Sequence, residues 1–305
     1  MANAFRASVL DSITSELGPL KKVAGSNSLV SFGDDVGRIY FRYSRLHSRG
    51  RAFYGLREVD LRQLEGRNSF ICFYSDDSSS PTVVPYADFE EIFHSTKPAS
   101  DGQYKVQIIA AGGTKELYVP GQGRFNVDGY VGTEALNRTL PDPRRSSLPP
   151  LSHCQVQTLV GSIGHLKGYD VFVPASNVCS LDWTLSSRFP LIRSLPAGYQ
   201  SIAGILGEID VIWVKSGTSK VEALFEVEHS TPVYSGLLRF NDVLLTDRSV
   251  SRFFVVSNDM RRALFARQLA RPTFRRSGLS ELTSFLEYAN VFDWHSRLAG
   301  DLDGN

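Results

Sequence analysis

Residues 207–240 read GEIDVIWVKSGTSKVEALFEVEHSTPVYSGLLRF, and this stretch decides the fold. Its pattern predicts an apolar strand carrying Glu208 and Asp210, a polar turn, a second apolar strand ending in Glu226 and Glu228, and then a helix. Side chains two residues apart on a strand point to the same face, so each pair of acids projects together. Adjacent strands would gather four carboxylates, which repel one another unless a cation lies among them. A hard divalent cation bound by oxygen ligands is the simplest such ion.

The segments on either side of this stretch continue the alternation of strands and helices. Upstream, residues 152–165 predict a helix and residues 169–174 a strand. Downstream, Thr231 as N-cap and Pro232 as first helical residue begin a helix, residues 251–257 predict a strand, and residues 260–270 and 281–292 predict helices. This order predicts a small α/β domain over residues 151–305, with a mixed sheet covered by helices on both faces.

The N-terminal part of the chain has a different pattern. A helix is expected over residues 3–18, followed by strand segments at 27–32, 36–44, 51–56, 70–75, 81–86 and 104–111, with short helical pieces at 59–65 and 87–94. We interpret residues 1–140 as an α+β or mostly β domain. Residues 137–150, NRTLPDPRRSSLPP, resemble an exposed connector, so we place the domain boundary there and the linker at 141–150.

The bulk composition is that of a soluble globular protein. The chain has 305 residues, a hydrophobic share of 42% and a net charge of +1, so only local patches can indicate a charged partner. Cys72, Cys154 and Cys179 follow no metal-binding or disulfide spacing, which favours reduced thiols. The N-terminus lacks the apolar core of a signal peptide, and no run is long enough to span a membrane. A cytoplasmic location is expected.

Two arginine-rich stretches are candidates for nucleic-acid binding. Residues 38–57, RIYFRYSRLHSRGRAFYGLR, carry six arginines among aromatic residues, and Arg42, Arg45 and Arg51 are the proposed DNA contacts. The alternative is a hairpin with buried aromatic residues and a solvated arginine face. Residues 260–278 carry six more arginines without an acid, with Arg261 and Arg271 as proposed contacts. Here the alternative is a solvated helix whose positive C-terminal end suits the helix dipole.

The carboxylate strands carry a family resemblance. A helix, a strand with Asp210, a turn, and a strand with Glu-Val-Glu at 226–228 resemble the PD-(D/E)xK nuclease superfamily, the fold of many restriction endonucleases. Ile209 stands where the family usually has proline, and Glu228 where it usually has lysine, as in its Glu-x-Glu version. Residues 151–290 further resemble bacterial proteins of restriction-endonuclease-like fold. His153 and Gln157 match their first helix, but Gln155 stands where an acid is expected.

The resemblance implies roles for individual residues. Asp210 and Glu226 would be the metal ligands, joined by the backbone carbonyl of Val227, and Glu208 would substitute for the missing acid of the first helix. Glu228 would hold or deprotonate the attacking water. His229 would contact phosphate or transfer a proton, or else simply flank the helix. Further site candidates are Gln157 and His153 on the first helix, and Ser230, Thr231 and Arg239 as DNA contacts, with plain helix capping as the alternative for Ser230 and Thr231.

The resulting prediction is a Mg²⁺-dependent DNA endonuclease, most similar to a type II restriction enzyme, in which Mn²⁺ can replace Mg²⁺. Double-stranded DNA is the expected substrate, and a homodimer is expected because two active sites must reach two strands. The alternative is a nuclease-like DNA-binding or regulatory protein without catalysis, which the missing lysine and Gln155 favour. A glycosidase with paired carboxylates is a more remote alternative.

Overall fold

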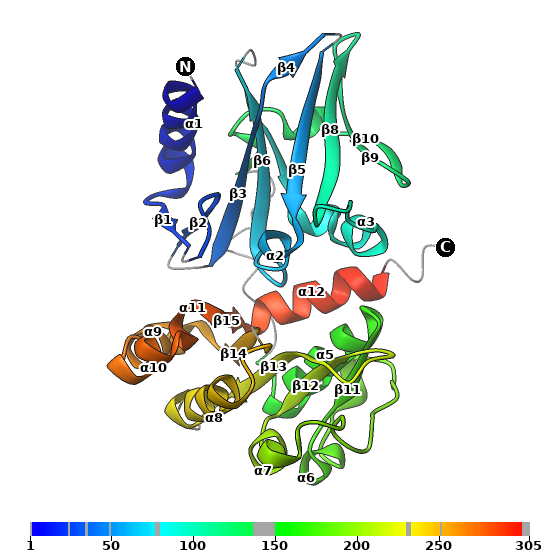
Figure 1. Cartoon of the computed structure of the whole chain (residues 1–305), viewed down its shortest axis with the longest axis vertical. Helices are drawn as coiled ribbons and strands as arrows, with labels where there is room; N and C mark the ends of the chain where they lie inside the picture. Colours follow the sequence, from blue (N-terminus) through cyan, green and yellow to red (C-terminus); the bar gives the residue numbers. More distant parts are fainter. Residues whose placement is uncertain are drawn as a thin grey trace. The chain divides into compact units, whose positions relative to one another are not determined.

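The computed structural model describes residues 2–23, 25–33, 36–48, 50–76, 80–136, 150–229, 233–250 and 252–300. The chain divides into two compact units, Met1–Pro143 and Arg144–Asn305 (Figure 1). Apart from Pro150, the predicted linker at 141–150 lies outside the described residues, as do Arg49, Ser230, Thr231 and Pro232.

The first unit contains two five-stranded sheets. The first sheet has the order β1 (Lys21–Lys22), β2 (Leu29–Phe32), β3 (Gly37–Ser44), β6 (Asn68–Ser75) and β7 (Thr82–Pro85). The second has the order β10 (Gly123–Asn126), β9 (Thr114–Val119), β8 (Gln103–Ala111), β5 (Arg51–Arg57) and β4 (Leu46–His47). The helices are α1 (Ala2–Leu17), α2 (Glu58–Leu61) and α3 (Glu90–Ser95), with 3-10 turns η1 (Tyr86–Asp88) and η2 (Asp128–Tyr130).

Alternation along the strands creates two cores in this unit. Tyr40 and Phe73 of the first sheet pack with Tyr54 and Val106 of the second, between the sheets. The opposite face of the first sheet is covered by α1, which lies beside β3 in Figure 1. Ile13 of this helix is fully buried. On β5 the burial alternates, so Arg51, Phe53 and Arg57 are exposed. The expected α+β character is therefore present, as a helix layer and two sheet layers.

The arginine-rich segment 38–57 forms a hairpin only over its second half, where Leu46 and His47 of β4 pair antiparallel with Ala52 and Arg51 of β5. β3 pairs in parallel with β6, whereas β5 pairs antiparallel with β8 in the other sheet. Arg38 is buried and donates to the backbone carbonyl of Gln63. The hairpin alternative is therefore confirmed for β4 and β5, where Tyr54 lies inward and Arg51 and Arg57 lie outward. It does not extend to β3, which joins the other sheet.

The second unit is built on a mixed sheet. Its order is β11 (Tyr169–Phe172), β12 (Val211–Lys215), β13 (Val221–Glu228), β14 (Phe253–Ser257) and β15 (Thr283–Glu287). The first three strands are antiparallel, and β13, β14 and β15 are parallel. The helices and 3-10 turns are α5 (His153–Leu166), α6 (Ala175–Val178), η4 (Trp183–Leu185), η5 (Gln200–Ile202), α7 (Ala203–Leu206), α8 (Val233–Thr246), η6 (Asp259–Arg261), α9 (Arg262–Leu269), α10 (Pro272–Ser277), α11 (Leu279–Leu282) and α12 (Tyr288–Gly300).

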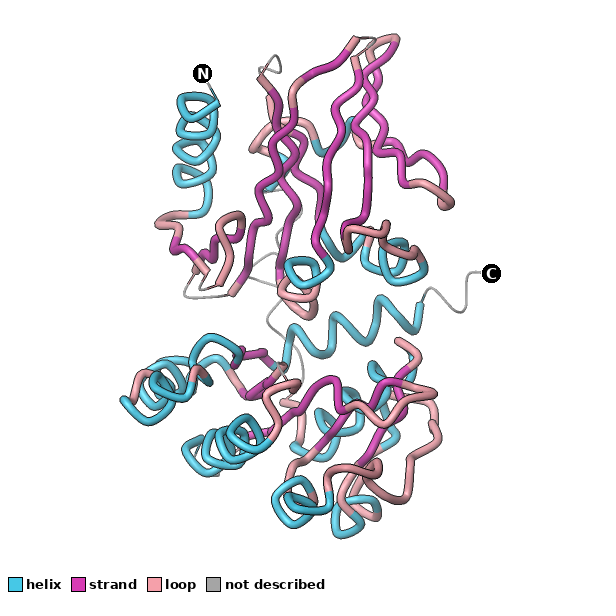
Figure 2. Tube along the Cα trace, viewed as in Figure 1, coloured by secondary structure: helices cyan, strands magenta, loops and turns pink. Residues whose placement is uncertain are grey.

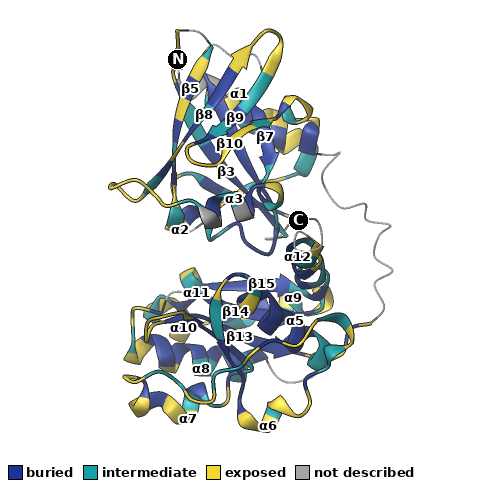
Figure 3. Ribbon diagram, turned by 90° about the vertical axis from the view of Figure 1, so that its right-hand side faces the viewer, coloured by how far each residue is buried: buried dark blue, intermediate teal, exposed yellow. Residues whose placement is uncertain are grey.

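Helices cover both faces of this sheet, which confirms the predicted α/β class (Figure 2). Val160 of α5 and Trp294 of α12 pack on one face, where Trp213 and Phe225 lie. Leu237 and Phe240 of α8 pack on the other. Every residue of β13 is buried, and the sheet strands are dark in Figure 3. Among the described residues, no helix has the length and apolarity needed to cross a bilayer.

Two sequence predictions for this unit were wrong. Glu208 and Asp210 do not lie within a strand, because β12 begins only at Val211. The helix predicted over residues 281–292 is instead the strand β15 followed by α12. A short apolar run fits the periodicity of a helix as well as that of a strand. Here Phe285 and Leu286 pack on opposite faces of the sheet, as consecutive strand residues do.

Candidate active site

Asp210 lies immediately before β12 and connects three elements. Its Oδ2 accepts a hydrogen bond from the backbone N–H of Val227 on β13 at 2.8 Å. Its Oδ1 accepts one from the side-chain amide of Asn177 on α6 at 3.3 Å, and its backbone carbonyl accepts one from Nε2 of Gln157 at 2.9 Å. The carboxylate is therefore fixed against the middle strand of the sheet.

Glu226 is a buried carboxylate, with 2% of its surface exposed. Arg239 of α8 donates Nε to Oε1 at 2.7 Å and its terminal amine to Oε2 at 2.9 Å, a bidentate pair. Burial, together with the charges of Asp210 and Glu228, nevertheless raises the pKa of Glu226 to about 7, against the lowering effect of Arg239. Negative charge is thus in excess at this position.

Glu228 lies next to Glu226 on the same face of β13 and is equally buried. Gly236 of α8 packs against both side chains, because a Cβ there would lie 3.1 Å from Cγ of Glu226 and 3.1 Å from Oε1 of Glu228. The backbone carbonyl of Glu228 accepts a hydrogen bond from the hydroxyl of Tyr288 at 3.2 Å. The glycine therefore lets α8 approach the carboxylates closely.

His153, the first residue of α5, faces Asp210. Its Nε2 is 3.6 Å from Oδ1 of Asp210. The nearby carboxylate of Asp210 raises the pKa of His153, and the backbone of Val227 adds to this shift against the desolvation caused by burial. The imidazole therefore favours its protonated form beside Asp210 and Val227.

Gln155 does not point toward the carboxylates. It is the N3 residue of a capping box, in which its Oε1 accepts from the backbone N–H of Ser152 at 2.9 Å and its own N–H donates to the hydroxyl of Ser152 at 3.2 Å. Gln155, which stands where an acid was expected, thus caps the start of α5 together with Ser152.

The other predicted site residues lie farther from the cluster. The side chain of Glu208 is 68% exposed and lies 3.7 Å from the guanidinium of Arg239. The placement of four carboxylates together was therefore wrong for Glu208, because its side chain is exposed to solvent. His229 is exposed, and its ring stacks on Tyr288 at a centroid distance of 6.2 Å. Ser230 and Thr231 are not described.

The predicted DNA-contacting arginines differ in their exposure and in the contacts that their guanidinium groups already make. Arg45 and Arg51 are exposed, whereas the guanidinium of Arg42 lies 5.4 Å from the centroid of the Tyr40 ring. In the second unit, Arg271 is exposed but lies 4.4 Å from the ring centroid of Tyr234, and Arg261 is half-buried. Their neighbour Arg262 pairs with Glu287 and Asp259, so part of the positive charge of this run is neutralised.

The donor set fits a hard cation in its chemistry. The carboxylates of Asp210 and Glu226 and the carbonyl of Val227 are oxygen donors of the kind that Mg²⁺ prefers. The pKa of Glu226 is raised mainly by burial, to which the charges of Asp210 and Glu228 add. Within the described ranges, however, no three His, Cys, Asp or Glu side chains are close enough to hold a metal ion. Arg239 instead occupies both oxygens of Glu226.

Sequence reasoning missed two contributors to this site. Asn177 comes from a turn-rich segment, and its contact with Asp210 depends on the tertiary fold alone. From the sequence, Gly236 could be recognised only as one residue of a predicted helix. Its role in the site depends on the close packing of Glu226 and Glu228 against it.

Residues 149–296 match a family model described as the type II restriction enzyme NmeDI C-terminal domain. Comparison with curated proteins and with solved structures gave no match. The matched range covers the sheet of the second unit, the helices on both its faces, and the cluster of Asp210, Glu226 and Glu228. The second unit is thus similar to the C-terminal domain of a type II restriction enzyme, and this similarity supports a restriction-enzyme-like nuclease.

Proposed function

We propose that this protein is a Mg²⁺-dependent DNA endonuclease of the type II restriction kind, with a PD-(D/E)xK-like site in its Glu-x-Glu version. The observation that carries the proposal is the cluster of the partly buried Asp210 with the buried Glu226 and Glu228, in the unit that matches a restriction-enzyme domain. Double-stranded DNA is the proposed substrate, and a homodimer the proposed assembly, because each strand of a duplex needs its own active site.

Asp210, Glu226 and the carbonyl of Val227 would hold the metal, which would supply an activated water and stabilise charge on the phosphodiester. The hydrogen bond from Val227 N–H orients Asp210 for this task. Glu228 is the proposed proton acceptor for the water. Arg239, released from Glu226, would bind a phosphate oxygen as a bidentate donor, and protonated His153 is a proton donor within reach of Asp210.

A cleavage assay tests this proposal. The wild-type chain is incubated with a mixture of plasmid and genomic DNAs of varied sequence, in Mg²⁺, in Mn²⁺ or in EDTA, beside Asp210→Asn and Glu226→Gln. We expect discrete fragments in either metal, none in EDTA, and a loss of at least about a hundredfold in both variants. Asp170→Asn is the matched control, because Asp170 lies on β11 and accepts a hydrogen bond from Ser216 instead. Cleavage that survives EDTA and both site variants would contradict the proposal.

A second candidate is a nuclease-like DNA-binding protein without catalysis. The bidentate pair of Arg239 with Glu226 favours it, because this pair satisfies one carboxylate without any metal. Calorimetric titration with Mn²⁺ separates the two candidates. A nuclease binds the ion in the wild type and loses it in Asp210→Asn, whereas the non-catalytic protein binds DNA equally well with and without EDTA and shows no site-dependent Mn²⁺ uptake.

A further inference from the structure

The first unit contains a cavity of about 320 Å³ between its two sheets. Its floor is formed by buried side chains, among them Tyr54 and Phe73. Its rim includes Leu46 and Ala110, which are exposed. The cavity therefore opens to solvent at one end of the sheets, and its size falls at the lower end of the roughly 300–1,000 Å³ typical of small-molecule sites.

Strand register explains why this space exists. Ala52 on β5 lies opposite Ile108 on β8, Ala110 lies opposite Lys115 on β9, and Phe73 on β6 lies opposite Thr82 on β7. These residues all face the space between the sheets, and two of them are alanines where a larger side chain would fill the space. Gly50 also adds no side chain to this space. A larger residue would not fit there, because its Cβ would lie 2.2 Å from the carbonyl oxygen of Ala110.

Two buried hydroxyls face this cavity. Ser75 and Thr82 are each 3% exposed, and within the described part of the chain neither hydroxyl forms a hydrogen bond. Neither oxygen is among the fully buried side-chain atoms without a partner, so both are accessible from the open cavity. A ligand that enters the cavity can hydrogen-bond both groups, and an apolar ligand would remove their access to water.

Lys115 adds a positive charge to the wall. Its Nζ donates to the carbonyl oxygen of Ser80 over a long distance of 3.5 Å, which leaves donor capacity free on the ammonium. Burial lowers the pKa of Lys115, and Asp128 partly opposes this shift. The cavity thus combines one cation and two hydroxyls with aromatic walls, where the rings of Tyr54 and Phe73 lie 4.9 Å apart.

This combination suits a flat, neutral ring with hydrogen-bond acceptors on its edge. A phosphate would need more positive charge than one half-buried lysine supplies, and a purely apolar ligand would leave Ser75 and Thr82 unpaired. A nucleobase has the required aromatic faces, together with carbonyl or ring-nitrogen acceptors along one edge.

We propose that this cavity binds a single nucleobase and, resting on the proposed DNA endonuclease function, that the base is rotated out of the duplex. A protein that extracts a base needs a pocket of this kind beside contacts to the DNA backbone. Exposed Arg45 and Arg51 flank β4, whose Leu46 forms part of the rim, so phosphate contacts lie next to the opening.

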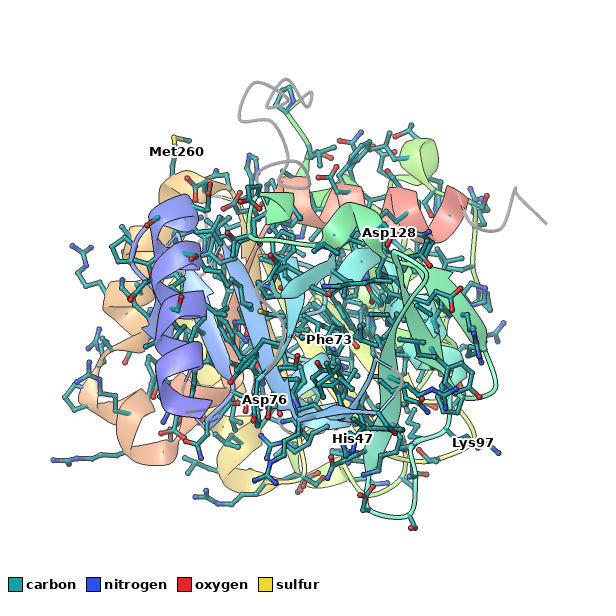
Figure 4. All side chains as sticks on the ribbon, turned by 90° about the horizontal axis from the view of Figure 1, so that it is seen from above. His47, Phe73, Asp76, Lys97, Asp128 and Met260 are labelled. Atoms are coloured by element: carbon teal, nitrogen blue, oxygen red, sulfur yellow. The ribbon has the colours of Figure 1, made fainter. Side chains whose placement is uncertain are left out.

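Free nucleosides provide the first arm of the test. Binding of each of the four deoxynucleosides to the full chain is measured by saturation-transfer NMR, for the wild type, Thr82→Val and Lys115→Met. We expect at least one nucleoside to bind, and both variants to weaken it about tenfold. Lys97→Met is the matched control, because Lys97 is exposed and lies at the periphery of Figure 4, whereas Phe73 lies in its middle.

Duplex DNA provides the second arm. The Asp210→Asn chain selects its preferred sequence from a pool of duplexes with a randomised core, and each base pair of that sequence is then replaced by a mismatch. A protein that extracts a base binds more tightly where pairing is already broken, so we expect about tenfold tighter binding at one position. Thr82→Val and Lys115→Met should remove this preference, and Lys97→Met should retain it.

The outcomes distinguish the possible sources of the base. Nucleoside binding without a mismatch preference, or without any selected duplex, assigns the cavity to a free nucleobase compound and overturns extraction from DNA. Absence of both effects, or effects that persist equally in the two cavity variants, overturns the proposal altogether. DNA cleavage is scored separately, so a chain that binds a base but never cuts DNA contradicts only the proposed endonuclease function.

Discussion

Glu226 is a buried carboxylate whose charge depends on one guanidinium. Arg239 supplies two hydrogen bonds, yet burial and the nearby charges of Asp210 and Glu228 keep the pKa of Glu226 near 7. Such clusters are maintained at a cost in stability and are characteristic of functional sites. The protonation state of this one residue therefore links the stability of the second unit to pH.

A pH-dependent stability follows from Glu226. Its folded pKa of about 7 exceeds its usual value of 4.5, so its favourable contribution is complete below about pH 4.5 and is lost as pH rises to about 7. Glu226→Gln should remove a fall of roughly 3 kcal/mol over this range. Urea unfolding followed by tryptophan fluorescence measures this, because all three tryptophans, Trp183, Trp213 and Trp294, lie in the second unit.

The difference between variant and wild type is taken at each pH, so that other titrating groups cancel. Asp170→Asn serves as the control, since Asp170 lies on a different strand and hydrogen-bonds to Ser216. Parallel pH profiles for wild type and Glu226→Gln would show that Glu226 has an ordinary pKa in the folded protein.

At the scale of the element, α5 packs closely on the sheet because it has glycine where it meets Trp213. Gly164 faces Trp213, and a Cβ at this position would lie 2.4 Å from the indole nitrogen. Trp213 is fully buried and donates that nitrogen to the carbonyl of Val160 at 3.1 Å. The helix cannot move outward freely, because its other contacts include a hydrogen bond at 3.0 Å between Ser162 and His295 of α12.

Gly164→Ala should therefore destabilise the second unit by about 1–3 kcal/mol, the usual cost of overpacking a filled core. Gly204→Ala is the matched control, because Gly204 lies in α7 and its Cβ would meet no atom within 4 Å. We expect this control to be neutral or more stable, as alanine is the better helix former. Equal unfolding midpoints in urea for the two variants would contradict the close packing of α5.

At the scale of the whole molecule, each unit contains hydrophobic cores of its own. We expect a fragment of residues 1–140 to retain DNA affinity that falls steeply with salt, because phosphate contacts release counterions. Arg51→Gln should reduce the slope of log K against log salt by about 1, since Arg51 is exposed. Arg62→Gln should leave the slope unchanged, because Arg62 already pairs with Glu58.

Filter binding at several salt concentrations measures these slopes. No DNA binding at low salt by the fragment would rule out a recognition role for the first unit. Equal slopes for wild type and Arg51→Gln would place the DNA elsewhere than beside β5.

The sequence by itself determined the α/β class of the second unit and the importance of the 207–240 stretch. Hydrophobic periodicity is a local property, so apolar runs identified β12, β13, α5 and α8 correctly. Glu226 and Glu228 were placed on one strand face for the same reason, because alternation along a strand is fixed by its pleat. The match of residues 149–296 to a restriction-enzyme domain agrees with the nuclease resemblance drawn from those residues.

Only the tertiary structure decided which partners meet the carboxylates. Glu208 fell outside the cluster because its side chain is exposed to solvent, whereas Asp210 hydrogen-bonds to Val227 of β13. Residues 283–287 became a strand because they pair in parallel with β14. Arg239 and Gly236 reach the site from α8 and Asn177 from α6, and the cavity between the sheets arises from register between strands distant in sequence. Contacts of this kind depend on packing between elements, which no local pattern encodes.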